Sequence, residues 1–104
     1  MTLAIEGDAL VSAHLREEYR VRLSDVEEVL LLEELPRLTR VVGTGMDTVA
    51  KGLFQVEGYG RCEVCLNPKE GPYLVVKTPL KVYLLGAANS GQMEEIYDEL
   101  QGVQ

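Results

Sequence analysis

The only two cysteines of the chain, Cys62 and Cys65, stand in the stretch GYGRCEVCLN with C-x-x-C spacing, which zinc and redox sites use. The residues around them alternate as in a strand, so Cys62 and Val64 share one face and Cys65 lies on the other. Residues three apart in a strand are separated by about 10 Å, whereas a disulfide needs Cα atoms within about 7 Å and a zinc site needs both sulfurs about 2.3 Å from one ion. We therefore expect two free thiols, as suits a reducing compartment.

No other residues form a recognisable catalytic set. His14, the only histidine, stands in a short apolar segment and is expected to be a surface or rim residue and not a catalyst. The acidic pairs, such as Glu17-Glu18, are typical of solvated charge, and Gly43-Thr44-Gly45 lacks the lysine and following helix of a phosphate-binding loop. The sequence thus predicts a protein that is not an enzyme, with no catalytic residue, no metal ligand and no cofactor.

Most of the chain alternates apolar and polar residues with a period of two, interrupted by turn residues, as short strands do. The predicted strands cover residues 3–5, 10–15, 19–23, 38–42, 52–57, 61–66, 73–77 and 81–85. In the second of these, Val11, Ala13 and Leu15 are expected on one face. Gly43-Thr44-Gly45 is expected to end the fourth at a sharp change of direction.

The segment Ser24–Leu35 allows a helix or a strand. Ser24 and Glu27 match a capping box and favour a helix, while the run Val29–Leu32 fits a buried strand, and Pro36 ends either element. We favour a brief turn at Ser24–Val26 followed by a strand.

The end of the chain changes to a helical period. One apolar stripe is formed by Met93, Ile96, Tyr97 and Leu100. Asn89 or Ser90 can cap the start of this helix, and Gly102 can end it. The sequence therefore predicts one mainly β domain over residues 1–104, in which about seven to nine short strands curl into a barrel and an amphipathic helix covers its open end or side.

The charge is uneven along the chain. Residues 1–36 carry three basic and nine acidic side chains, residues 37–81 carry seven and four, and residues 82–104 carry four acidic side chains and no basic one, for a net charge of −7. An acidic domain repels phosphate backbones, so we expect no nucleic-acid partner. The start lacks the long apolar core of a signal peptide, and no run reaches the length of a membrane span.

Several segments together resemble the bacterial pleckstrin-homology-like (bacterial PH) domain family. They are RVVGTG (40–45), GLF (52–54), GYG (58–60), PYLVVKT (72–78), VYLL (82–85), EIYDEL (95–100) and the earlier RLSDVEEV (22–29). The resemblance implies a bent, partly open antiparallel barrel capped by the C-terminal helix. Eukaryotic relatives that bind inositol phosphates use a basic cluster in the first hairpin loop. Here that turn is Glu6-Gly7-Asp8, with Arg16 alone after the second strand, which argues against headgroup binding of that kind.

The leading hypothesis is a non-enzymatic interaction module that binds a protein or assembles with itself through open strand edges. The alternative is a peripheral binder of anionic lipid or a small ligand, which would need Lys51, Arg61, Lys69 and Lys77 to converge in space. Tyr59, between glycines at a hairpin tip, is the tyrosine expected to be exposed at an interface. We expect a cytoplasmic location, at the cytoplasmic face of the membrane if the chain is part of a longer membrane protein.

Overall fold

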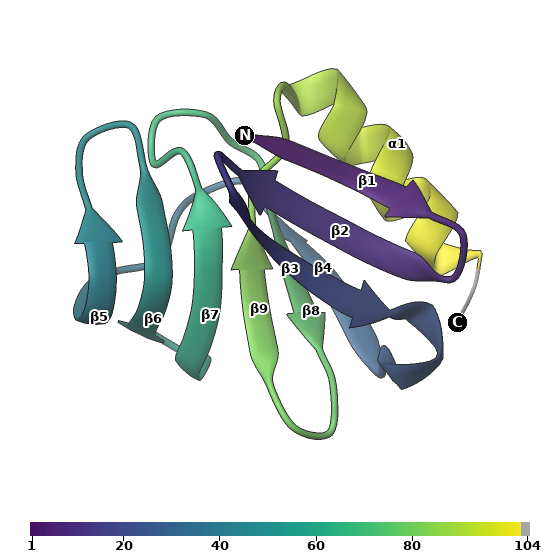
Figure 1. The fold of residues 1–104 in the computed structure, drawn as a ribbon, viewed down its shortest axis with the longest axis horizontal. Coiled ribbons are helices and arrows are strands. Elements are labelled where there is room, and N and C mark those ends of the chain that lie inside the picture. The colour runs from purple at the N-terminus through teal and green to yellow at the C-terminus, as the bar shows by residue number, and fades with distance from the viewer. Residues whose placement is uncertain (103–104) are drawn as a thin grey trace.

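The computed structural model describes residues 1–102 and is mainly β, with nine strands, one 3-10 turn and one C-terminal helix (Figure 1). The strands are β1 Thr2–Glu6, β2 Ala9–His14, β3 Glu17–Arg22, β4 Glu28–Leu32, β5 Leu38–Gly45, β6 Ala50–Val56, β7 Gly60–Leu66, β8 Tyr73–Lys77 and β9 Val82–Leu85. The 3-10 turn η1 covers Leu23–Asp25, and the helix α1 covers Ser90–Gln101. The mainly β class with a C-terminal helix is confirmed. Residues 103–104 of the predicted domain lie outside the described residues.

The first sheet has the order β1-β2-β3 and is built from two tight hairpins. His14 pairs with Glu17, so only Leu15 and Arg16 remain for the second turn. Leu15 adopts a φ of 56° there and is 91% exposed. The prediction that Leu15 shares one face of the strand with Val11 and Ala13 was wrong, because the strand stops one residue earlier to make room for the turn.

The second sheet has the order β4-β8-β9-β7-β6-β5. All its neighbours are antiparallel except β7 and β9, which are parallel. The expectation of a wholly antiparallel barrel was wrong in this one pair. The cause is long-range: β8 follows β7 in the chain but pairs with β4 and β9, so the hairpin from β8 returns β9 to the side of β7.

The second sheet must curl, because its two edge strands are joined by a short connection. β4 and β5 stand at opposite ends of the order, five strand spacings or about 24 Å apart in a flat sheet. Residues 33–37 connect them and reach about 21 Å when fully extended. Leu35, in this connection, packs with Leu30 and Leu38 against the face that the curl encloses. The result is the partly open barrel that the sequence predicted.

Each face of the second sheet covers its own core. One core also contains residues of the first sheet and of α1, including Leu10, Val21 and Met93. The other lies inside the curl and contains residues such as Phe54, Val64 and Leu84. Cys65 belongs to the first core and Cys62 to the second, and both are buried and free. The expectation of two strand thiols on opposite faces is confirmed.

Two local predictions are confirmed and one needs correction. The segment from Ser24 forms the η1 turn and then β4, and the side chain of Asn89 caps α1 by accepting a hydrogen bond from the Gln92 N–H at 2.8 Å. However, β5 runs on through Gly43, Thr44 and Gly45 instead of ending before them. Their partners on β6 continue the ladder as far as Gly45 and Ala50, so these glycines lie inside a strand pair.

Candidate functional site

The outer edge of β5 is the most exposed strand edge of the second sheet. β5 is the last strand in the order, is eight residues long, and only Leu38 in it is even half-buried. Figure 1 shows it at the far side of the molecule from α1. Val41 and Val42 are 40% and 67% exposed, and Met46, just beyond the strand, is 66% exposed. An exposed edge with apolar side chains is a template for pairing with another strand.

A pair of glycines holds β5 tightly against β6. Gly43 and Gly52 are directly paired and have φ values of 130° and 126°. A Cβ on Gly52 would collide with the carbonyl oxygen of Val42 and lie 2.8 Å from the Cα of Gly43. Only glycine allows this close approach, which follows a bulge between Arg40 and Val42. The open edge therefore belongs to a firmly attached strand.

A second open edge lies on the first sheet, where β1 runs beside α1. A groove of about 200 Å³ is lined on the strand side by Leu3, Ala4 and Ile5. Successive residues of a strand point to opposite faces of the sheet. Because three consecutive residues of β1 line the groove, the groove lies against the backbone edge of the strand and not against one of its faces. From the helix, Ile96 contributes an apolar side chain, and Glu95 and Glu99 contribute carboxylates.

A cleft also separates the two sheets, and two aromatic rings divide it. The rings of Tyr19 on β3 and Tyr83 on β9 lie 5.9 Å apart at an angle of 58°. On one side is a hollow of about 450 Å³ that contains Lys51 and Glu63. On the other side is a hollow of about 400 Å³ below the turn that joins β8 to β9.

In the first hollow, Lys51 is satisfied by residues of this chain. Its side chain is only 10% exposed, its Nζ lies 3.4 Å from a carboxylate oxygen of Glu17, and it stands over the Tyr19 ring at 5.1 Å. Burial, followed by the charge of Glu63, raises the pKa of Tyr19, so its hydroxyl stays protonated. The lysine thus ties β6 to β3 and leaves no free cation to attract a ligand.

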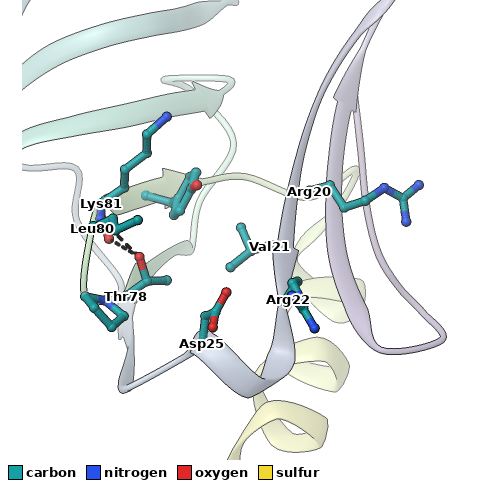
Figure 2. A pocket seen from close by; sticks show the side chains of 9 residues that line it. Arg20, Val21, Arg22, Asp25, Thr78, Leu80 and Lys81 are labelled. Atoms are coloured by element: carbon teal, nitrogen blue, oxygen red, sulfur yellow. Dashed lines mark hydrogen bonds between the residues drawn. The ribbon is translucent and has the colours of Figure 1, made fainter.

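In the second hollow, the charged groups do not converge on one point (Figure 2). The carboxylate of Asp25 points into the hollow, while the side chain of Arg20 points away from it (Figure 2). Thr78 donates a hydrogen bond to the carbonyl oxygen of Lys81 at 2.8 Å and accepts one from its N–H at 3.1 Å, which closes the turn. This arrangement stabilises a turn and offers no preformed anion site.

The four basic residues proposed for ligand contact are divided between the two ends of the second sheet. Lys51 and Lys69 lie toward the end where β7 stops, whereas Arg61 and Lys77 lie at the opposite end. Lys77 pairs with Glu28 at 3.1 Å. The sequence could not show this separation, because it depends on the order of strands that are distant in the chain.

Tyr59 is half-buried, although an exposed position was expected. Its ring packs against the core inside the curl, and the Nζ of Lys77 stands 5.7 Å from its centre. His14, half-buried at the end of β2, has the rim position that the sequence predicted, and its Nδ1 is buried without a hydrogen-bond partner among the described residues. Within residues 1–102, no group of three or more His, Cys, Asp or Glu side chains could hold a metal ion.

The comparisons with known proteins agree with this architecture. A family model described as bacterial PH domain matches residues 1–101. The chain belongs to the bacterial PH domain family. No curated protein and no solved structure matches it. The resemblance seen in the sequence is thereby confirmed, and it extends over nearly the whole of this bacterial PH domain.

Membership of the family bears on function at a coarse level. PH-like domains are generally interaction modules without catalytic activity, and this bacterial PH domain shares that fold. In the part of the chain that the structure describes, no helix is long and apolar enough to cross a membrane.

The residues that sequence reasoning missed are those of the β5 edge. The sequence does contain a signal for this edge, namely apolar side chains beside glycines at Val41, Val42 and Met46. That these side chains are exposed follows only from the position of β5 at the end of the sheet.

Proposed function

We propose that this domain is a non-enzymatic interaction module that binds an extended protein segment as an additional strand on β5. The observation that carries the proposal is the β5 edge, which has no pairing strand among residues 1–102, is eight residues long and is exposed on both faces. Main-chain hydrogen bonds to such an edge give affinity, and neighbouring side chains give specificity. Val41 and Val42 supply apolar contact beside that edge.

Most protein edges are protected by short strands, lysines, prolines or a covering element. β5 contains no lysine and no proline, and its only charged residue is Arg40. The one protective feature in the strand is the bulge at Val41, between Arg40 and Val42. The edge of β5 therefore has little protection against pairing with another strand. An edge of this kind is expected when pairing with another chain is the purpose of the strand.

The test is selection from a phage-displayed library of random linear peptides, followed by titration calorimetry and amide hydrogen exchange with the selected peptides. We expect bound peptides to slow exchange at the β5 amides, and the substitution Val42→Asp to weaken binding by about tenfold or more, equivalent to about 1.4 kcal/mol. The matched control is Leu80→Asp, which makes the same kind of change at a 93% exposed residue on a distant turn. Selected peptides that protect another surface, with β5 unchanged, would exclude strand addition at β5.

The alternative of peripheral lipid binding has less support, since its four basic residues lie at opposite ends of the sheet and two of them are in ion pairs. Flotation with anionic and with neutral vesicles at low and high salt tests it directly. Salt-sensitive flotation with anionic vesicles alone would favour the lipid alternative over the protein-binding proposal.

A further inference from the structure

The β5 edge and the β1 edge carry opposite charge. On and beside β5, Arg37 and Arg40 are exposed, and no acidic residue occurs between positions 37 and 46. Neither arginine is in an ion pair within residues 1–102. This edge therefore combines unpaired backbone, two valines and two free positive charges.

The groove between β1 and α1 has the complementary character. Its floor contains Ile5 and Ile96, and Glu95 and Glu99 line its helix side. The exposed face of α1 carries four acidic side chains and no basic one, and Glu6 at the end of β1 is also exposed. None of these carboxylates is paired with a cation in the described part of the chain.

We infer that the occupant of the β1–α1 groove is β5 of a second copy of this chain. The inference rests on the proposed function, since it takes β5 as the strand that is added, and it names the partner. Arg37 directly precedes β5 and accepts a backbone hydrogen bond from the Glu57 N–H at 3.0 Å, beside the first residue pair of the strand. The extended chain therefore directs the side chains of Arg37 and Arg40, three positions apart, to opposite faces. One of them then meets Glu95 and Glu99 of the neighbouring copy, and the other meets Glu6 on the outer face of β1.

This contact joins two different surfaces, so it is heterologous. In Figure 1, β5 and the β1–α1 pair lie on opposite sides of the molecule, which leaves both edges of each copy accessible at once. Repetition of a heterologous contact produces a ring if the rotation closes and a filament if it does not. Because exposed charges contribute to it, the association weakens as salt screens them.

The experiment measures the mass of the purified chain by size-exclusion chromatography with light scattering over a range of concentrations. We expect species larger than the 11.5 kDa monomer at low salt, and a dissociation constant that rises about tenfold or more at high salt. The double variants Arg37→Glu/Arg40→Glu and Glu95→Lys/Glu99→Lys each retain one intact surface. Each alone is expected to be monomeric, because in each variant β5 and the groove carry like charge. An equimolar mixture is expected to associate again, because the intact β5 of one variant meets the intact groove of the other and the two reversed surfaces are also complementary.

The matched control is Glu27→Lys/Glu70→Lys, which changes the net charge as much as the groove variant does, at two exposed residues that belong to neither surface. It is expected to associate like the unmodified chain. Circular dichroism and urea unfolding confirm that each variant is folded before its mass is interpreted. Association by the Glu95→Lys/Glu99→Lys variant alone would overturn the inference, since a symmetric β5–β5 contact does not need the groove.

A chain that stays monomeric at every concentration and salt level would also overturn the inference. The proposed function would survive that result if selected peptides still protected the β5 amides of the monomer. Self-association through the groove without protection of the β5 amides would overturn the inference alone, while selected peptides that protect another surface would exclude the proposed function. The two proposals can therefore fail separately.

Discussion

Replacing Gly52 with alanine tests how firmly β5, the strand with the open edge, is attached to the sheet. At φ of 126°, Gly52 has a backbone conformation that residues with a side chain rarely adopt. Its added Cβ would collide with the carbonyl oxygen of Val42 and with the Cα of Gly43, and both are backbone atoms of a paired strand. Neither can rotate away as a side chain could.

The expected loss of stability has two parts. Holding a non-glycine residue in such a conformation costs about 1–3 kcal/mol, and relieving the collision by shifting β5 costs about 1–3 kcal/mol more. The sum of about 2–6 kcal/mol is a large part of the 5–15 kcal/mol typical of a domain. For a chain of this length, a loss of about 3 kcal/mol lowers the Tm by about 12 °C or more.

The assay is urea unfolding of Gly52→Ala beside Gly7→Ala as the matched control. Gly7 also has a positive φ, of 63°, but a Cβ there would have no atom within 4 Å. The control is therefore expected to lose about 1–2 kcal/mol, from conformation alone. If β5 detaches locally instead, hydrogen exchange will show its amides losing protection while the core keeps its own. Two variants of equal stability, with β5 still protected in both, would refute the reasoning about the close strand pair.

Three further outcomes are expected, each measured by urea unfolding. Leu15→Asn should stabilise the domain by about 1 kcal/mol, because Leu15 is 91% exposed and has a φ of 56°, which asparagine adopts more readily. An unchanged free energy of unfolding would contradict this expectation. Lys51→Met should be tolerated within about 1 kcal/mol, while Lys51→Ala should cost about 2 kcal/mol, because the buried stem contributes packing and the partner Glu17 is 79% exposed. Both variants remove the charge, so equally large losses would show that the charge dominates. Burial raises the pKa of Cys62 from 9.0 to about 11, so the native state keeps a proton that the unfolded chain has lost. The contribution of the Cys62 thiol to the free energy of unfolding is therefore fully present below about pH 9, and it falls by about 2 kcal/mol as the pH rises to about 11. Cys62→Ala should reduce that slope, and an unchanged slope would exclude the thiol as its source.

Local signals in the sequence predicted most elements correctly. Alternation located the strands, and the cap at Asn89 with the stripe that includes Met93 and Leu100 located the helix. The same alternation placed Cys62 and Cys65 on opposite faces, because the period of a strand does not depend on its neighbours.

The features that the sequence did not reveal all depend on distant pairing. Nothing near β7 or β9 indicates that they are parallel neighbours, since the strand between them in the chain pairs elsewhere. The alternation of β6 puts Lys51 on one face with Leu53, but its burial requires Tyr19 of the other sheet to lie over it. Gly43 looked like the end of a strand because glycine usually interrupts one, and only the close contact with Gly52 shows why glycine is required inside this pair.

The connection between β4 and β5 explains why the barrel stays partly open. The ladder of the second sheet makes these two edge strands run in the same direction, so closing the barrel between them would require a parallel pair. Parallel neighbours joined directly need a crossover of about a dozen residues or more, and the chain supplies only residues 33–37. These five residues are short enough to curl the sheet and too short to let its edges pair. On the other side, α1 packs beside β4, whereas in the described residues no element covers β5. The connectivity of the chain thus keeps the β5 edge open, which the proposed addition of a strand requires.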